Sequence, residues 1–297
     1  MFIPTYDGSG QAVHPDILYW KDQYWMTCTP YPYGVDTYEN PCIYTSKDNY
    51  NWQVPDGCIN PLAYPSINNS GYHLSDPCLL AFKNSLMIYY RETHKINGVD
   101  KSYIKMISST DGQKWSNPIM VMQSETDSLI SPALLSSQEH CFMFHVRLQN
   151  PYGGTIILSE SDDGINWDSQ KEVIVENLPE NMAICHISIM TKDRYDKEIS
   201  HDNTSNNNIL GLFLLSDVST ANKYKLYWAS TKGSLLHWCI NEEVRIPFEL
   251  QQRPKSFYKS TVMPINGDLL LSAIDSKYRW YLYPISTSDD NTTLKNQ

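Results

Sequence analysis

The sequence predicts an all-β protein, and more specifically a five-bladed β-propeller of four-stranded antiparallel blades. Two observations indicate this fold. Short apolar or alternating runs of strand length recur along the 297 residues, whereas helical periodicity is scarce. The same strand-and-turn unit also returns five times along the chain. Its period of roughly 50 to 70 residues is typical of a propeller and not of a sandwich.

A polar turn that ends in tryptophan closes most of these units. The copies are Ser46–Trp52, Ser109–Trp115, Ser161–Trp167 and a looser Ser230–Trp238. Their Asp-Gly and Asp-Asn pairs tolerate the left-handed backbone of a tight hairpin, and the tryptophan can fold back over the turn. The turns therefore predict where successive blades end.

A second recurring element opens each unit, ahead of a turn and a strongly strand-forming run. The openings are His14–Leu18, Asp76–Leu80, Ser131–Leu135, His186–Met190 and Ser260–Pro264. Together with the closing turns they predict one domain over residues 1–297, with its blades at approximately 12–60, 74–125, 129–178, 183–248 and 257–286. The last blade has only three strand-forming runs. We expect residues 1–6 to add its missing strand, because ring closure removes exposed sheet edges.

The charge balance restricts the partners. The chain has 33 acidic and 23 basic residues, a net charge of −10, so we expect no nucleic-acid partner. No apolar run reaches the length of a membrane span, and we expect no membrane insertion. The first residues lack the basic and apolar regions of a Sec signal, which predicts a cytoplasmic protein or one exported without a recognisable Sec signal. The oligomeric state is left open.

Cysteine and histidine spacing gives no metal or disulfide motif. The seven cysteines are scattered and none forms a C-x-x-C pair. The histidines are dispersed too, although His14, His145 and His186 can converge in space as zinc or calcium ligands. We therefore assign no metal and no cofactor.

Blade geometry predicts which residues meet at the axis. The start of each innermost strand and the loop between the second and third strands border the same funnel mouth. The carboxylates at these positions, which are our catalytic candidates, are Asp76, Asp16, Glu39 and Glu92. The predicted substrate-binding residues are His14, Tyr31, Tyr33, Asn40, Arg91, His94, Ser131, His145, Arg147, His186, Asp217, Lys259 and Ser260.

Basic and aromatic residues favour an anionic or polyhydroxylated ligand. Arg91, Arg147 and Lys259 converge on one opening of an acidic protein, and arginine suits a carboxylate, sulfate or phosphate group. Alternatively, Arg91 pairs with Glu92 or with an acid of a neighbouring blade. The 21 tyrosines and 8 tryptophans suit stacking on sugar rings, although most tyrosines can simply pack between sheets.

Hydrolysis of a glycosidic bond needs an acid and a base or nucleophile on opposite sides of the bond. Asp76 is the most specific candidate, because an Asp-Pro pair that opens an inner strand aims its side chain into the channel. Its structural alternative is capping of exposed backbone N–H groups. The alternative for Asp16 is a bond to an adjacent blade, and for Glu39 and Glu92 it is a salt bridge within a loop.

At the strand openings the chain resembles the five-bladed glycosidases of glycoside hydrolase families 43 and 32. The resemblance spans nearly the whole chain and implies a base or nucleophile Asp in blade one, a supporting Asp in blade two and an acid Glu in blade three. Asp76 in Ser75-Asp76-Pro77 matches the second element. The first position holds His14, with Asp16 two residues later, and blade three has Ser131-Pro132 without an acid.

We therefore expect a carbohydrate-active propeller that acts, in the manner of a glycoside hydrolase, on a glycan or anionic sugar in its central funnel. The rearranged acid pair is Asp76 with Glu39, Glu92 or Asp16. The alternative is a non-catalytic glycan-binding propeller, for surface-polysaccharide handling or phage host recognition. The sequence leaves open whether the protein is an enzyme.

Overall fold

The structure is a computed structural model of the whole chain. It describes all residues except 67–71, 97–98, 125–127, 138, 169, 191–208, 221–222, 247–256, 265–266 and 287–297. Strands make up nearly all of the regular secondary structure of the described residues, as predicted; the helices among them are two short 3-10 turns, Pro32–Gly34 and Asp36–Tyr38. No helix within the described residues is long and apolar enough to cross a membrane.

The strands form several sheets. The first contains β1 (Ala12–Trp20), β2 (Gln23–Pro30) and β3 (Cys42–Ser46). The second contains β4 (His73–Phe82), β5 (Ser85–Ile96), β6 (Val99–Ser109) and β7 (Ile119–Ser124). The last contains β17 (Thr261–Val262), β18 (Leu269–Ile274) and β19 (Trp280–Ile285).

The remaining strands share one sheet of nine strands. Its first part is β8 (Ser128–Ser136), β9 (Cys141–Asn150), β10 (Gly153–Ser161) and β11 (Lys171–Glu172). Its second part is β12 (Ile174–Glu176), β13 (Met182–Met190), β14 (Leu210–Asp217), β15 (Tyr224–Ser234) and β16 (His237–Glu243). The pairing of β12 with β16 is parallel, whereas we predicted antiparallel blades.

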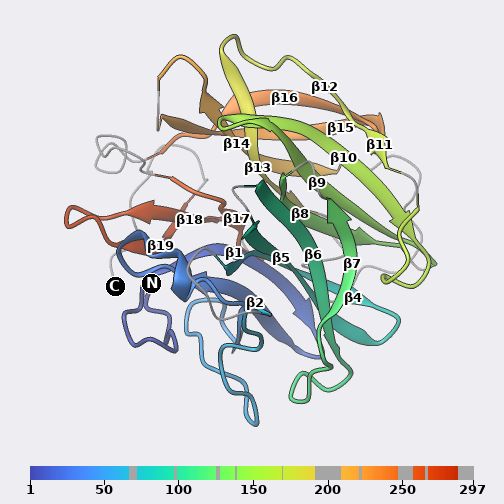
Figure 1. Cartoon of the computed structure of the whole chain (residues 1–297). Coiled ribbons are helices and arrows are strands. Elements are labelled where there is room, and N and C mark those ends of the chain that lie inside the picture. The colour runs from blue at the N-terminus through green and yellow to red at the C-terminus, as the bar shows by residue number, and fades with distance from the viewer. Residues whose placement is uncertain are drawn as a thin grey trace.

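The sheets surround a common centre (Figure 1). The innermost strands β1, β4, β8 and β13 contact one another in that order, and β1 also packs against β17, β18 and β19. Apolar side chains fill the spaces between neighbouring sheets, so the core is divided into clusters around the ring. This leaves the centre free for polar side chains.

Two details of the predicted strands are wrong. Residues 1–5 form no strand: the chain turns between Ile3 and Gly8, and Pro4 has no N–H to donate to a ladder. The segment nevertheless lies against the last sheet, since the amino group of Met1 donates to the carbonyl oxygen of Leu282 at 3.1 Å. The first sheet also has three strands instead of four.

In place of that fourth strand, Gln53 pairs with Thr45 through a single bridge. Pro55 follows two residues later and cannot donate to a ladder, and its carbonyl oxygen instead accepts from the N–H of Cys58 in a turn. The strand pairing therefore ends after one bridge.

The first three closing turns share one hydrogen-bonding pattern, whereas the fourth, Ser230–Trp238, lies in the β15–β16 hairpin. In the second copy, Ser109 Oγ accepts from the Gly112 N–H at 2.8 Å, and Asp111 Oδ1 accepts from the backbone N–H groups of Gln113 and Lys114. These bonds lower the pKa of Asp111 to about 2. Two of these turns also pack on the preceding sheet: Gly112 faces the ring of Trp25, and Gly164 faces Tyr89.

A β-bulge interrupts each of the four innermost strands at the same place. The register shifts at His14, Asp76 and Ser131, each of which precedes a proline and has a left-handed backbone with φ of 56°, 52° and 54°. In β13 the bulge falls at Cys185, just before His186. Since a bulge re-aims the side chain of the extra residue, this repeated device places the side chains that form the centre.

Candidate functional site

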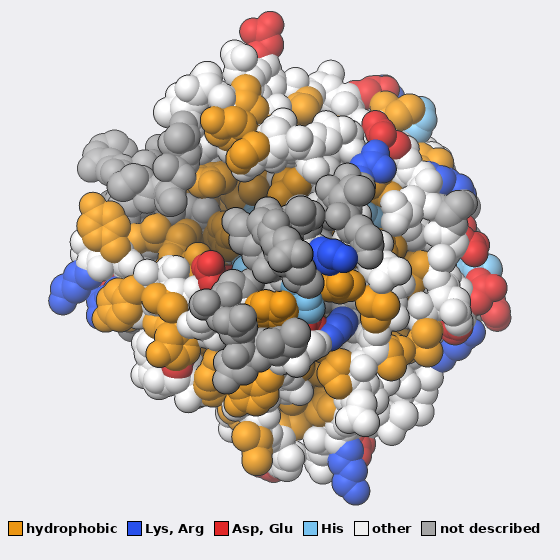
Figure 2. Space-filling view, viewed as in Figure 1, with side chains coloured by type: hydrophobic (Ala, Val, Ile, Leu, Met, Phe, Trp, Pro, Cys, Tyr) orange, Lys and Arg blue, Asp and Glu red, His pale blue; other side chains and the backbone are white. Residues whose placement is uncertain are grey.

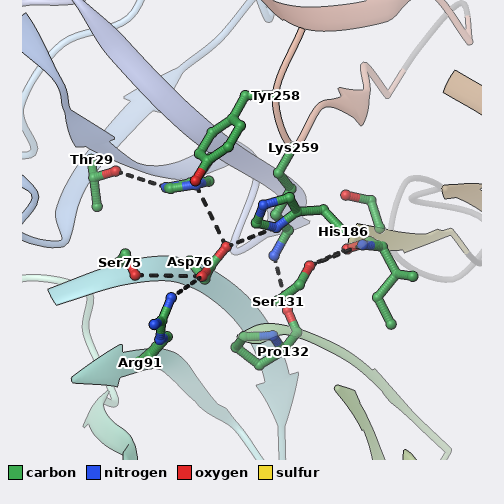
Figure 3. Close-up of polar contacts among 12 residues, drawn as sticks. Thr29, Ser75, Asp76, Arg91, Ser131, Pro132, His186, Tyr258 and Lys259 are labelled. Atoms are coloured by element: carbon green, nitrogen blue, oxygen red, sulfur yellow. Dashed lines mark hydrogen bonds and ion pairs between the residues drawn. The ribbon is translucent and has the colours of Figure 1, made fainter. Parts of the chain in front are cut away.

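Three side chains from three separate sheets converge at the centre (Figure 3). Asp76, on β4, is 1% exposed. Its Oδ1 lies 3.5 Å from Nε2 of His14, on β1, and 3.2 Å from Nδ1 of His186, on β13. These residues are far apart in the sequence, and the convergence follows from their equivalent places at the openings of the innermost strands.

The three facing atoms have no hydrogen-bond partner among the described residues. They are His14 Nε2, Asp76 Oδ1 and His186 Nδ1, and all lie within 4.8 Å of one another. Ligand atoms about 2.1 Å from a tetrahedral or octahedral metal ion lie about 3.0 to 3.5 Å apart, close to the observed 3.2 and 3.5 Å. Two imidazoles and one carboxylate therefore fit a divalent cation. The sequence predicts no metal because these ligands share no local spacing.

Further contacts fix the orientation and charge of these groups. Nδ1 of His14 is 3.1 Å from Thr29 Oγ1, on β2, which leaves Nε2 facing Asp76. Burial lowers the pKa of His14 to about 3. Burial opposes the charge of His186 as well, but Cys185 and Asp76 outweigh it and raise its pKa to about 9. Asp76 has a pKa well below its usual range because the two histidines outweigh its burial.

Glu39 lies beside this group, in the β2–β3 loop. Its Oε1 is 3.8 Å from His14 Nδ1 and its Oε2 is 3.8 Å from His73 Nε2. Burial first, and then the charge of Asp76, raise its pKa well above the usual value. Two neighbouring carboxyl groups thus have opposite shifts, with Asp76 ionised and Glu39 protonated, and such a pair can divide base and acid roles.

Tyr258 covers the two histidines and is a residue that our sequence reasoning missed. Its ring centre lies 4.6 Å from that of His14 and 4.7 Å from that of His186. Burial, together with Glu39 and Asp76, raises the pKa of its phenol well above 10, so the phenol keeps its proton. Its position next to Lys259 was the available signal. Thr29 and His73 were missed in the same way.

Two cations complete the centre. Arg91 Nη1 lies 3.8 Å from Asp76 Oδ2, and Arg91 Nη2 donates to Ser128 Oγ at 3.3 Å. Its Nε is buried without a hydrogen-bond partner among the described residues. Lys259 is buried and donates to the carbonyl oxygen of Pro132 at 3.0 Å. Figure 2 shows basic and histidine side chains near the middle of this face.

Two of the four predicted catalytic carboxylates are engaged in other contacts. Asp16 Oδ2 accepts from the Leu79 N–H at 2.7 Å and so links β1 to β4, which is the alternative given above. Glu92 is fully buried, pairs with Lys105 and lies 2.6 Å from His94 Nε2. Glu92 thus forms a salt bridge, but it lies on strand β5 and pairs with a residue of β6 and not within a loop as expected; the predicted substrate residue His94 belongs to the same network.

Several predicted substrate-binding residues also make structural contacts. Ser131 Oγ bonds to the backbone of Ile187. The remaining contacts are Ser260 Oγ with the backbone of Tyr258 and Ser272, Arg147 with Glu172, Asp217 with Ser219 and Thr220, and Asn40 Nδ2 with Tyr6 Oη. These polar groups build the walls and loops around the centre.

The other predicted residues lie in two places. Tyr31 and Tyr33 are in the β2–β3 loop with Glu39, and Tyr31 stacks near Tyr258 at 6.4 Å between ring centres. His145 is fully buried on β9, and both ring nitrogens lack a hydrogen-bond partner among the described residues. Burial and Arg147 lower its pKa to about 4.

Comparison with solved structures shows which known proteins share this fold. No protein family matches the chain as a whole or in part. The crystal structure of an N-acetylgalactosamine deacetylase from F. plautii, in complex with blood group B trisaccharide, superposes with a TM-score of 0.71 at 18% identity, covering 92% of this chain and 88% of that one. A GH43 endo-arabinanase from Bacillus licheniformis gives 0.58 at 14% identity, with 94% and 95% covered. The Bombyx mori GH32 β-fructofuranosidase gives 0.61 at 12% identity, with 96% and 62% covered.

The chain has the propeller fold of these glycosidases. The resemblance inferred from the strand openings is thereby confirmed. In sequence, the propeller is also 28% identical over 116 residues to the A type blood N-acetyl-α-D-galactosamine deacetylase of Flavonifractor plautii. The matched segment spans 37% of the propeller and only 15% of that protein's length.

Proposed function

We propose that the protein is a metal-dependent hydrolase that removes the acetyl group from an N-acetylated amino sugar bound in its funnel. The observation that carries this proposal is the convergence of His14 Nε2, Asp76 Oδ1 and His186 Nδ1, three buried atoms without hydrogen-bond partners among the described residues. Within the described residues their close contacts are the ion pairs with one another, and a cation ligated by all three would satisfy these buried atoms together.

A divalent cation held by these residues would polarise the amide carbonyl and lower the pKa of a bound water. Thr29 fixes His14 with Nε2 toward the centre, as partners of metal-binding histidines generally do. Glu39 lies beside His14, and in its ionised form it would take a proton from the attacking water and pass it to the amide nitrogen; its raised pKa makes the ionised carboxylate a stronger base. The water oxygen bonds to the carbonyl carbon, the C–N bond breaks, and acetate and the free amine leave.

Two donors are available for the oxygen on which negative charge develops. The phenol of Tyr258 keeps its proton, and the buried Nε–H of Arg91 has no partner among the described residues. Pre-positioned donors of this kind contribute strongly to catalysis because they need no rearrangement during the reaction. We expect one or both to bind the carbonyl oxygen.

The choice of an acetylated amino sugar draws on the comparisons. The deacetylase is similar to this chain both in part of its sequence and in its fold. In addition, Asp16 and Glu92, two of the carboxylates available for glycosidic cleavage, have structural contacts. One ionised carboxylate between two histidines suits metal-assisted cleavage of an amide better than cleavage of a glycosidic bond, which needs two carboxyl groups.

Glycoside hydrolysis is a second candidate, and the opposite pKa shifts of Asp76 and Glu39 favour it. An ionised Asp76 would act as base or nucleophile and a protonated Glu39 as general acid. The non-catalytic glycan-binding propeller remains the third reading. The three differ in their products, because deacetylation releases acetate, glycosidic cleavage releases a new reducing end, and binding releases neither.

The test measures both products in one reaction. The protein, freed of metal with a chelator and then supplied with zinc, manganese or cobalt, is incubated with oligosaccharides that end in N-acetylgalactosamine. We expect acetate release that depends on the added metal and falls at least about 100-fold in Asp76→Asn and His186→Ala. His140→Ala is the matched control, because His140 is an exposed histidine paired with Asp162 and should leave acetate release unchanged.

If the reaction releases new reducing ends but no acetate, the protein is a glycoside hydrolase and not a deacetylase. Binding without either product would leave the glycan-binding reading.

We also propose that the sheets form five blades with the predicted boundaries. The register joins β10 and β13 through one residue pair, Gly154 with Ile184, so the nine-stranded sheet divides there into two units. An experimental structure in which β8–β11 and β13–β16 lie at separate angles around the axis would support this count, whereas one continuous sheet would contradict it.

A further inference from the structure

Two exposed tyrosines at the edge of the funnel have unusual backbones. Tyr33, in the β2–β3 loop, is 69% exposed and has a φ of 55°, and Tyr278, in the β18–β19 turn, is 66% exposed and has a φ of 60°. Bulky residues rarely adopt this left-handed conformation, and it persists only where the surroundings impose it. Both large apolar rings are therefore held out into solvent at some cost.

Gln11 holds the two loops together. Its buried Oε1 accepts from the Tyr33 N–H at 3.0 Å and from the Trp280 N–H at 3.1 Å. In the second loop, the Tyr278 N–H donates to the carbonyl oxygen of Asp275 at 3.1 Å, and the Arg279 guanidinium donates to Asp275 Oδ2. The exposed rings thus stand on pinned backbones, which reduces the entropy lost when a ligand binds them.

Aromatic packing connects these loops to the centre. Tyr31, two residues before Tyr33, and Trp280, two residues after Tyr278, lie 6.4 and 5.7 Å from Tyr258 between ring centres. Tyr258 in turn contacts His14. Hydrophobic side chains gather over the β18–β19 side of the funnel face (Figures 1 and 2). The tyrosines therefore lie on the outward continuation of the wall of the site.

The chemistry of the two loops suits a sugar ring. Tyrosine presents a flat apolar face with a polar tip, which matches the C–H face and hydroxyl groups of a pyranose. Arg279, next to Tyr278 in the chain, adds a guanidinium to this loop, with its Nε and Nη2 bound to Asp275. Tyr33 also shares its loop with Glu39, so a sugar placed on it would be continuous with one placed in the centre.

We propose that Tyr33 and Tyr278 form a second sugar subsite at the funnel edge, which binds the residue next to the one that reacts, so that the substrate is an oligosaccharide and not a monosaccharide. This inference rests on the proposed function for the position of the reacting sugar. Binding at the edge also supplies energy remote from the reacting group, which an enzyme can use to position that group.

Calorimetry on the metal-free protein tests the subsite without requiring turnover. The ligands are free N-acetylgalactosamine and a trisaccharide that ends in it. We expect Tyr33→Ala and Tyr278→Ala each to weaken trisaccharide binding by about 3- to 10-fold, and monosaccharide binding by less than about 2-fold. Tyr33→Trp should restore the affinity, because it returns an aromatic face. Met120→Ala, an exposed apolar residue on β7, is the control and should change neither affinity.

Equal loss of both ligands, an unchanged trisaccharide affinity in the tyrosine variants, or no trisaccharide binding by the unaltered protein would each overturn the subsite. Selective loss of trisaccharide binding in a protein that releases no acetate would uphold the subsite while rejecting the deacetylase proposal. The two proposals can therefore fail separately.

Discussion

Single side chains determine what the centre of the propeller can bind. Asp76 is held between His14 and His186 by a bulge that a proline follows, and each histidine presents one nitrogen to it. The bulge alone does not settle which nitrogen of His14 faces inward, because the ring can turn. Thr29 does so through its contact with Nδ1.

Thr29→Val should weaken metal binding by about 10- to 100-fold without unfolding the protein, since it removes a hydroxyl that orients a ligand and keeps the volume of the side chain. Thr29→Ser retains the hydroxyl and should restore most of the affinity. Metal titration of the three proteins measures this. Equal affinities for all of them would show that Thr29 has no role in orienting His14.

Glu92→Gln should destabilise the fold by roughly 1 to 3 kcal/mol and leave catalysis unchanged, because Glu92 is buried in ion pairs with Lys105 and His94. Burial raises the pKa of Glu92, but its hydrogen bonds with Lys105, Ser66 and His94 together outweigh burial, and the net shift is downward. The stabilisation is therefore complete above a pH of about 4.5 and is lost as the pH falls through the lower folded-state pKa.

Denaturant unfolding of the Glu92→Gln variant and the unaltered protein at several pH values checks this. A loss of kcat at full stability would instead return Glu92 to the catalytic group.

The sequence predicts some of these residues well and others poorly, for physical reasons. His14, Asp76 and His186 are predictable because a repeat reveals equivalent strand openings. The pairing of Glu92 with Lys105 depends on the register of β5 and β6, and the packing of Tyr258 depends on how sheets meet across the centre. Neither contact can be predicted from the spacing of residues along the sequence. A candidate metal site made from three distant strands is hidden for the same reason.

At the scale of elements, two of the closing turns contact the sheet before their own. Gly112 lies against Trp25 of the first sheet, and the carbonyl oxygen of Gly164 accepts from Tyr89 Oη of the second sheet at 2.7 Å. The sequence predicts these turns from their Asp-Gly pairs, but not which neighbouring side chain they touch. The N-terminal segment is the opposite case: it lies against the last sheet as predicted, but the strand predicted for it does not form.

Gly112→Ala should destabilise the protein by roughly 2 to 4 kcal/mol. A Cβ there would come within 2.1 Å of the Trp25 ring, on a backbone with φ of 78°. Gly233→Ala is the matched control, because Gly233 has a φ of 71° but nothing within 4 Å of a Cβ, and it should lose only about 1 to 2 kcal/mol. Unfolding midpoints compare the two, and equal losses would show that packing on Trp25 contributes nothing.

At the scale of the whole molecule, the centre brings together sheets that are distant in the sequence. His14, Asp76 and His186 come from β1, β4 and β13, so an ion bound between them would link three sheets across the axis. A ligand that binds only the folded state stabilises it by about 2.7 kcal/mol at a concentration 100 times its Kd. Metal binding should therefore raise the Tm.

The metal site is tested most directly by measuring the metal stoichiometry of the purified protein and then titrating the chelated protein with a divalent cation. We predict one ion per chain, with a raised Tm, and loss of both in Asp76→Asn and in His186→Ala but not in His140→Ala. A chain that binds no divalent cation, or that binds one equally well without Asp76, would contradict the central claim.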